Sequence, residues 1–120
     1  MRTWRTATLW VALLAAGVTL AGAHSWALYD DTRGQWLKGT VVSTTYQRPH
    51  QLIELEVQKP EHRIWTVVLA SPSKMESRGF PVSRLVAGLE LKTYLYPARD
   101  VPHERRALRI VVNGNTTELW

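Results

Sequence analysis

The stretch that decides the fold is SPSKMESRG, residues 71–79, a short helical pattern between runs of β-forming residues. Ser71 is suited to cap the N-terminus of a helix, Pro72 to occupy its first position, and Gly79 to end it. Ser73 and Glu76 have the spacing of an alternative capping box slightly further along. The stretch therefore predicts one short helix in a chain that is otherwise rich in β-branched and aromatic residues.

Five extended segments surround this helix, three before it and two after it. Their order with the helix is that of the OB-fold, a five-stranded Greek-key barrel whose helix lies between the third and fourth strands. A closed barrel is favoured over an open antiparallel meander, because so short a chain buries little surface and a closed sheet exposes no edge. We therefore expect a mainly β, five- to six-stranded OB-like barrel. The segments are residues 36–46, 52–57, 64–70, 89–96 and 107–113.

The patterns within these segments predict the core. Residues 64–70 are apolar on both faces, as in a central strand. Trp36 and Trp65 are interpreted as core or strand-packing residues. In the last segment Arg109 is expected to point outward, and the side chains expected to point inward are Leu108, Ile110 and Val112.

Two further short strands are expected at the ends of the barrel. Residues 31–34 form a turn pattern, so residues 25–29 are expected to add an edge strand before the barrel. Asn113, Gly114 and Asn115 have the composition of a hairpin turn. This turn allows residues 116–120 to return as a final strand.

The N-terminus has the three-part pattern of a secretory signal peptide. Two arginines precede an apolar run, residues 7–22, and small residues follow at the positions that a signal peptidase reads. The run is shorter than the ~20 residues of a membrane-spanning helix, which favours cleavage over an uncleaved anchor. The preferred cut follows Ala23, with an alternative after Ala27. We expect a signal peptide, residues 1–23, and one periplasmic or secreted domain, residues 24–120, with no membrane anchor after cleavage.

Charge and cysteine content exclude several classes of function. The 120 residues include 15 basic and 10 acidic side chains, a formal charge of +5, and no cysteine. Loss of Arg2 and Arg5 with the signal peptide would leave 13 basic side chains, a charge of +3 over 97 residues. Because an exported protein meets little nucleic acid, no nucleic-acid partner is expected. The absence of cysteine excludes disulfides, thiolate zinc sites, iron–sulfur clusters and thiol catalysis.

A series of short motifs runs through nearly all of the expected mature chain. In order they are His24-Ser25, Tyr29-Asp30, Gly39-Thr40-Val41, Arg48-Pro49-His50, Trp65, Ala70-Ser71-Pro72, Arg78-Gly79-Phe80, Gly88 and Pro97-Ala98-Arg99-Asp100. The series resembles the family of short exported bacterial proteins catalogued as domain of unknown function 6152. Members often have His-His-Ser and Asn-Pro-His where this chain has Ala23 before His24 and Arg48 before Pro49, and the usual Gly after Arg-Asp is Val101 here. The resemblance implies an exported barrel without an established activity.

His24 is the candidate metal ligand, because a cut after Ala23 gives it a free α-amino group beside its imidazole. The pKa of such an amine is near ~7.7–8, so it can bind a metal at neutral pH. A second imidazole would complete a three-nitrogen site of the histidine-brace type, which favours Cu(II). His50 is the expected partner because it occupies the Asn-Pro-His position of the family pattern. In the simpler interpretation, His24 is an exposed terminus and His50 a hydrogen-bonding loop residue.

The alternative function is a non-catalytic recognition domain for an envelope partner protein or an anionic ligand. Its basic and aromatic surface would consist of Arg99, Arg105, Arg106, Arg109, Tyr94 and Tyr96. On an OB-fold such a surface is also typical of single-stranded nucleic-acid binding, which export argues against. No enzyme is expected, since the sequence has no nucleophile elbow, phosphate loop or metalloprotease motif. His62 and His103 lie in polar turns and are interpreted as solvated loop residues.

Overall fold

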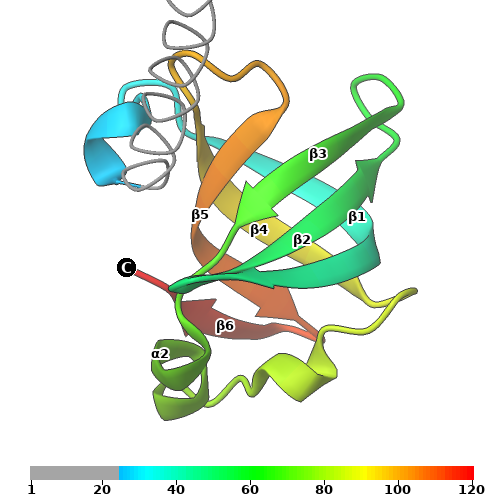
Figure 1. Ribbon diagram of the computed structural model, residues 1–120. Helices are drawn as coiled ribbons and strands as arrows, with labels where there is room; N and C mark the ends of the chain where they lie inside the picture. Colours follow the sequence, from blue (N-terminus) through cyan, green and yellow to red (C-terminus); the bar gives the residue numbers. More distant parts are fainter. Residues whose placement is uncertain (1–24) are drawn as a thin grey trace, which may run out of the picture.

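The computed structural model describes residues 25–120 and shows a mainly β protein (Figure 1). The expected signal peptide and His24 lie outside the described residues. In residues 25–120, no helix is both long enough and apolar enough to cross a membrane. The elements are the 3₁₀ turn η1 (Trp26–Leu28), β1 (Gln35–Gln47), β2 (His50–Val57), β3 (Arg63–Val68), α2 (Pro72–Ser77), the 3₁₀ turn η2 (Val82–Arg84), β4 (Glu90–Pro97), β5 (Glu104–Val112) and β6 (Asn115–Glu118).

Strands β1 to β5 close into a barrel. β1 pairs antiparallel with β2 along one edge and with β4 along the other. β2 continues to β3 and β4 to β5, and a short parallel pairing of residues 66–68 with residues 104–106 closes the circle. β6 follows the expected turn at Asn113 and Gly114 and extends the sheet beyond β5. This confirms the OB-like barrel and excludes the open meander.

β1 belongs to both halves of the barrel because it is 13 residues long and bends. Gly39 lies where β1 pairs with β2 on one side and β4 on the other. A Cβ atom at this position would lie 2.5 Å from the carbonyl oxygen of Glu56, so only glycine fits without a backbone shift. Val42 is the extra residue of a bulge, since the register passes from Val41 directly to Ser43.

The core fills the barrel, and α2 with the segment after it closes one end (Figure 1). Ser71 caps α2, because its side-chain oxygen accepts a hydrogen bond from the Lys74 backbone amide at 3.2 Å. The expected helix and its first cap are thus confirmed, whereas Ser73 lies inside the helix and is not the cap. Met75 and Phe80 are fully buried and pack into the core.

The segment before β1 is not the edge strand expected over residues 25–29. It forms η1, and within it only Tyr29 pairs, in an isolated antiparallel bridge with Ala98. The Arg99 amide also donates a hydrogen bond to the Leu28 carbonyl at 2.9 Å. The prediction was wrong because the segment is held at the end of β4, where Tyr29 pairs with Ala98 and the Asp30 amide donates a hydrogen bond to the Pro97 carbonyl at 2.9 Å, and it does not turn back along β1.

A bulge in β5 changes which side chains enter the core. Tyr94 of β4 lies opposite Arg109, but the next residue, Leu95, lies opposite Ala107, so Leu108 is the extra residue. The predicted inward position of Leu108 is therefore wrong, and its side chain is only half-buried. The bulge shifts the alternation by one residue, and the buried apolar positions of β5 are Ala107, Ile110 and Val112.

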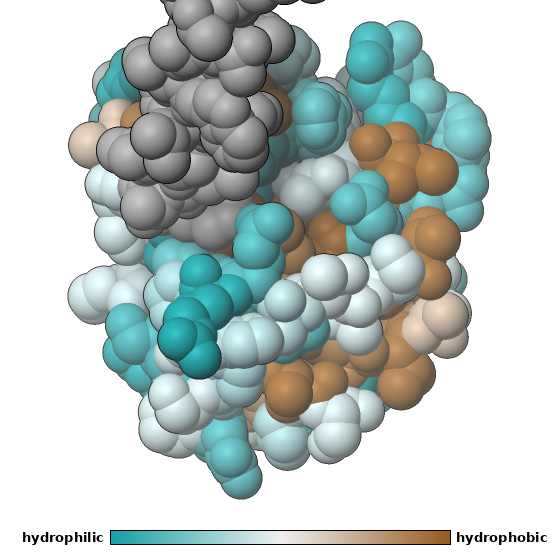
Figure 2. Space-filling model, in the orientation of Figure 1, coloured by the Kyte–Doolittle hydropathy of each residue, from teal (hydrophilic) through white to brown (hydrophobic). Residues whose placement is uncertain are grey.

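Ile64 and Trp36 are among the large apolar side chains exposed at the surface. Ile64 is 49% exposed, because among the described strands β3 has β5 as its neighbour only over residues 66–68. Trp36 is also 49% exposed, because the alternation of β1 places Leu37 in the core and Trp36 outside. Trp36 is therefore a strand-packing residue and not a core residue. Figure 2 shows apolar side chains interspersed with hydrophilic ones over one face of the barrel.

Candidate binding surface

Four aromatic side chains form a continuous row on the outer surface where β1, β4 and η1 meet. Trp36 packs on Tyr94 with ring centroids 5.4 Å apart, Tyr94 on Tyr96 at 6.0 Å, and Tyr96 on Trp26 at 6.3 Å. The sheet builds the row, because Trp36 lies opposite Tyr94 and the two tyrosines alternate onto one face of β4. Tilted and edge-on ring pairs of this kind each stabilise the fold by about 0.5–1.5 kcal/mol beyond area burial.

Two cations lie over rings of this row. The Lys92 ammonium is 6.0 Å from the ring centre of Trp36, and the Arg109 guanidinium is 5.6 Å from that of Tyr94. The Nε atom of Arg109 also lies 3.4 Å from a carboxylate oxygen of Glu118. These contacts hold long side chains against the rings in a defined position. Together these side chains form the aromatic band, which consists of Trp26, Trp36, Tyr94, Tyr96, Lys92 and Arg109.

Arg106 lies beneath the band and not on the surface. Its side chain is only 6% exposed, and its guanidinium lies 4.0 Å from the ring centre of Trp26. Burial lowers the pKa of Arg106 from its ordinary value, while Tyr29 and Glu104 act in the opposite direction. Arg106 therefore supports η1 from below, and its guanidinium is covered by Trp26 and Tyr29.

The other two arginines of the predicted surface lie in different places. Arg99 donates a hydrogen bond from Nε to the Ala27 carbonyl at 3.3 Å, so it lies beside η1 at one end of the band. Arg105 is outside the band, at the end of the barrel opposite α2, with its guanidinium 4.1 Å from the ring centre of Trp65. The structure thus gathers four of the six predicted surface residues, which are Arg99, Arg109, Tyr94 and Tyr96.

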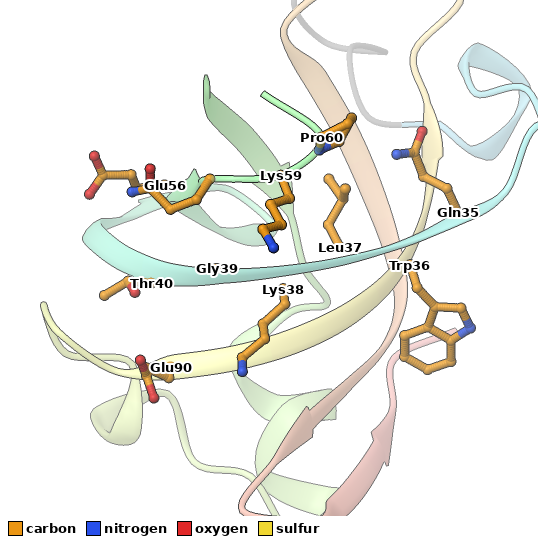
Figure 3. A pocket seen from close by; sticks show the side chains of 11 residues that line it. Gln35, Trp36, Leu37, Lys38, Gly39, Thr40, Glu56, Lys59, Pro60 and Glu90 are labelled. Atoms are coloured by element: carbon orange, nitrogen blue, oxygen red, sulfur yellow. The ribbon is translucent and has the colours of Figure 1, made fainter. Parts of the chain in front are cut away.

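A hollow lies at each end of the band. The larger, of about 720 Å³, is formed by the first part of β1 and the loop after β2. Figure 3 shows Trp36 at one end of it, Glu56 and Glu90 at the other, and Lys38 and Lys59 between them. The side chains lining this hollow thus carry both signs of charge. The second hollow, of about 400 Å³, lies beside Trp26, Tyr96 and Arg99.

The histidines do not form a cluster in residues 25–120. His50, the first residue of β2, is half-buried, and His103 is exposed in the loop before β5. His62 forms a hydrogen bond of 2.7 Å with Glu56. Nowhere in the described part of the chain do three His, Asp or Glu side chains come together as a metal site. The copper site stays a prediction, because its first ligand, His24, lies outside that part.

Sequence reasoning missed Trp26 and Trp36 as members of the band. A signal for Trp36 was present, because Leu37 and Val41 are the apolar, inward positions of β1 and Trp36 is out of phase with them. Trp26 had no such signal. Its position depends on η1 folding back beside β4, which no local pattern predicts.

The fold and this surface together define a class of protein, a small OB-like barrel with an exposed aromatic and basic band. A family model matches residues 11–118, and the chain belongs to the family of unknown function DUF6152. The match confirms the resemblance carried by the short motifs. A search of curated proteins and a search of solved structures each returned no match. Since the family has no assigned activity, function is inferred from the surface itself.

Proposed function

We propose that this protein is an exported, non-catalytic recognition module whose aromatic band binds an acidic segment of an envelope partner protein. The band supports the proposal through its composition, because Trp, Tyr and Arg side chains dominate the binding energy of protein interfaces. Trp36 and Trp26 are 49% and 39% exposed, so their rings are accessible to a partner. The export part of the proposal rests on the signal-peptide pattern of residues 1–23.

The charge of the band favours an acidic partner. Lys92 and Arg109 lie along the row, and Arg99 lies at one end of it. Cations in this arrangement steer an acidic partner toward the surface and fix its orientation. The ring contacts already hold Lys92 and Arg109 in place, which lowers the ordering cost of binding.

The shape of the band favours an extended segment. The row of rings runs from the hollow beside Trp36 to the hollow beside Trp26. A segment laid along the row would place a side chain in each hollow and its carboxylates near Arg109 and Arg99. A small ligand would fill one hollow and leave the rest of the band unused.

Site-specific photocrosslinking in cells that export the protein tests this proposal. A benzoylphenylalanine at position 94 is expected to form an adduct with a partner, and mass spectrometry of the adduct is expected to identify an acidic segment. Position 46 is the matched control, because Tyr46 is also an exposed strand tyrosine, 55% accessible and outside the band. The purified partner should then bind the variant carrying Trp36→Ala and Arg109→Gln at least tenfold more weakly than the wild type.

Three results would contradict the proposal. Position 94 could give no adduct, or both positions could give the same adducts, or the cross-linked segment could lack acidic residues. Each outcome is read directly from the crosslinking and mass spectrometry. A folded variant, checked by its circular dichroism spectrum, that binds the partner as tightly as the wild type would also contradict the role of the band.

A second proposal is Cu(II) binding by the mature N-terminus, with His24 and His50 as ligands. Support comes from the sequence alone, through the amine that a cut after Ala23 creates. N-terminal sequencing of the exported protein establishes whether His24 is the first residue. Cu(II) titration should then show tight binding that an added N-terminal Met abolishes. Equal binding by both forms, or a mature chain that begins at Leu28, would contradict it.

A further inference from the structure

A cationic hollow lies at the end of the barrel opposite α2, outside the aromatic band. Its volume is about 340 Å³, and it is formed where β3 and β5 begin and where β2 ends. Two guanidinium groups lie near the ring of Trp65 in β3, that of Arg105 at 4.1 Å and that of Arg63 at 5.7 Å from its ring centre. Glu61 lines the same hollow and pairs with Arg63 at 2.7 Å.

The Arg105 side chain is incompletely paired. Its Nε atom is buried and forms no hydrogen bond with any described protein atom. Its Nη1 atom reaches only the Glu104 carbonyl, at 3.4 Å. In the described part of the chain, Arg105 has no carboxylate within ion-pair distance, whereas Arg63 has Glu61 and Arg109 has Glu118.

The charges around Arg105 repel it. Burial lowers the pKa of Arg105 from its ordinary value, and the positive charges of Arg33 and Arg63 lower it further. A half-buried cation among like charges is unfavourable unless an anion compensates it. The contact with Trp65 accounts for the position of the guanidinium plane, but it provides no acceptor for the Nε–H group.

We propose that this hollow is a binding site for a phosphate group, held by Arg105 and Arg63. The two arginines that line the hollow outweigh its one glutamate, Glu61, and the positive charge of Arg33 also acts on Arg105, so the surroundings favour an anion such as phosphate or a phosphate monoester. The planar fork of arginine donates paired hydrogen bonds to such an oxyanion. The hollow has room for the phosphate and for part of the molecule that carries it. The site shares none of these arginines with the aromatic band, so each proposal stands or fails without the other.

Titration with inorganic phosphate at low ionic strength, followed by ¹H–¹⁵N NMR, tests the site. The Nε–H resonance of Arg105 and the indole resonance of Trp65 are expected to shift with phosphate. Arg105→Gln and Arg63→Gln should each raise the dissociation constant at least tenfold. Arg84→Gln is the matched control, because Arg84 also lies over a ring, 4.4 Å from the centre of Phe80, at a different place in the fold.

A stability measurement separates a phosphate site from a purely structural role. If Arg105 serves phosphate, Arg105→Gln without phosphate is expected to unfold at the same or a higher temperature than the wild type, because repulsion is relieved. Phosphate should raise the unfolding temperature of the wild type and not that of the variant. A large loss of stability in the variant without phosphate, with no response of the wild type to phosphate, would overturn the proposal.

A second arm identifies the source of the phosphate group. Vesicles of phosphatidylcholine with phosphatidic acid present a phosphate monoester on a membrane. Sedimentation with these vesicles that Arg105→Gln abolishes would assign the site to a lipid phosphate, whereas a response to inorganic phosphate alone would assign it to a soluble one. The absence of both responses, or the same responses from wild type and Arg105→Gln, would overturn the site.

Discussion

The hydroxyl group of Tyr29 donates a hydrogen bond of 2.5 Å to a carboxylate oxygen of Glu104, a residue 75 positions later in the chain. Tyr29 is only 2% exposed, and Glu104 is the first residue of β5 and part of the parallel pairing that closes the barrel. This bond attaches the segment before β1 to the closure point of the barrel. It also fixes η1, and with it Trp26, at the end of the aromatic band.

Tyr29→Phe is predicted to lower the free energy of unfolding by about 1–3 kcal/mol, because the bond joins a buried hydroxyl to a carboxylate. Chemical denaturation at neutral pH measures the change. Tyr46→Phe is the control, since that side chain is exposed, and its effect should stay within about 0.5 kcal/mol. Equal effects of the two substitutions would show that the Tyr29 bond adds nothing to stability.

The same tyrosine predicts an alkaline limit to stability. Burial raises the pKa of Tyr29 well above the ordinary value of 10.0, and so do the hydrogen bond to Glu104 and the negative charge of Glu104. The positive charge of Arg106 has a smaller, opposite effect on this pKa. Because the folded-state pKa is the higher one, this stabilisation is complete below pH 10 and is lost progressively as the pH rises above it. The difference in unfolding free energy between wild type and Tyr29→Phe should therefore shrink above pH 10. Denaturation at several pH values measures it, and a difference that stays constant would contradict the assignment.

Gly39→Ala is predicted to destabilise the barrel by about 1–3 kcal/mol through overpacking. The new methyl group would lie 2.5 Å from the Glu56 carbonyl oxygen and 2.8 Å from Cγ of Leu55. The obstacle is mainly backbone of β2, so a side-chain rotation cannot remove the clash. Ser43→Ala, at an exposed position of the same strand, is the control. Thermal unfolding that gives equal midpoints for both variants would rule out the close approach.

Ser71→Ala is predicted to lower the free energy of unfolding by about 1 kcal/mol, because the Lys74 amide in the first turn of α2 loses its side-chain acceptor. Ser73→Ala should have a smaller effect, since Ser73 does not cap the helix. Urea denaturation of both variants tests the order of the two effects. The reverse order would favour the capping box that begins at Ser73.

The strands and the helix of this protein could be predicted because their signals are local. Alternation in residues 52–57 gives the buried set Ile53, Leu55 and Val57, and the capping pattern gives α2. The prediction fails where the local conformation depends on a contact between residues far apart in the sequence. The bulge at Leu108 arises from the pairing of β5 with β4, and η1 forms because Tyr29 packs against β5.

The candidate site could be predicted only in part, for the same reason. Tyr94 and Tyr96 share a face because they are two residues apart on one strand, which the sequence shows. Arg105 and Arg106 are adjacent in sequence, and neighbouring residues of a strand point to opposite faces. Arg105 therefore lies in the hollow at the barrel end, and Arg106 lies beneath Trp26. The sequence alone placed both arginines on one surface, because it does not show which face of the sheet each side chain occupies.

By itself, the sequence determined the β class, the order of strands and helix, the family and the residue types available for binding. These follow from periodicity and from turn and cap chemistry, which act over a few residues. The tertiary structure decided which of those residues meet. Barrel closure brings β3 to β5 and places Arg105 over Trp65, and the fold-back of η1 completes the aromatic band with Trp26. Such contacts depend on strand register and closure across the whole chain, which no local pattern encodes.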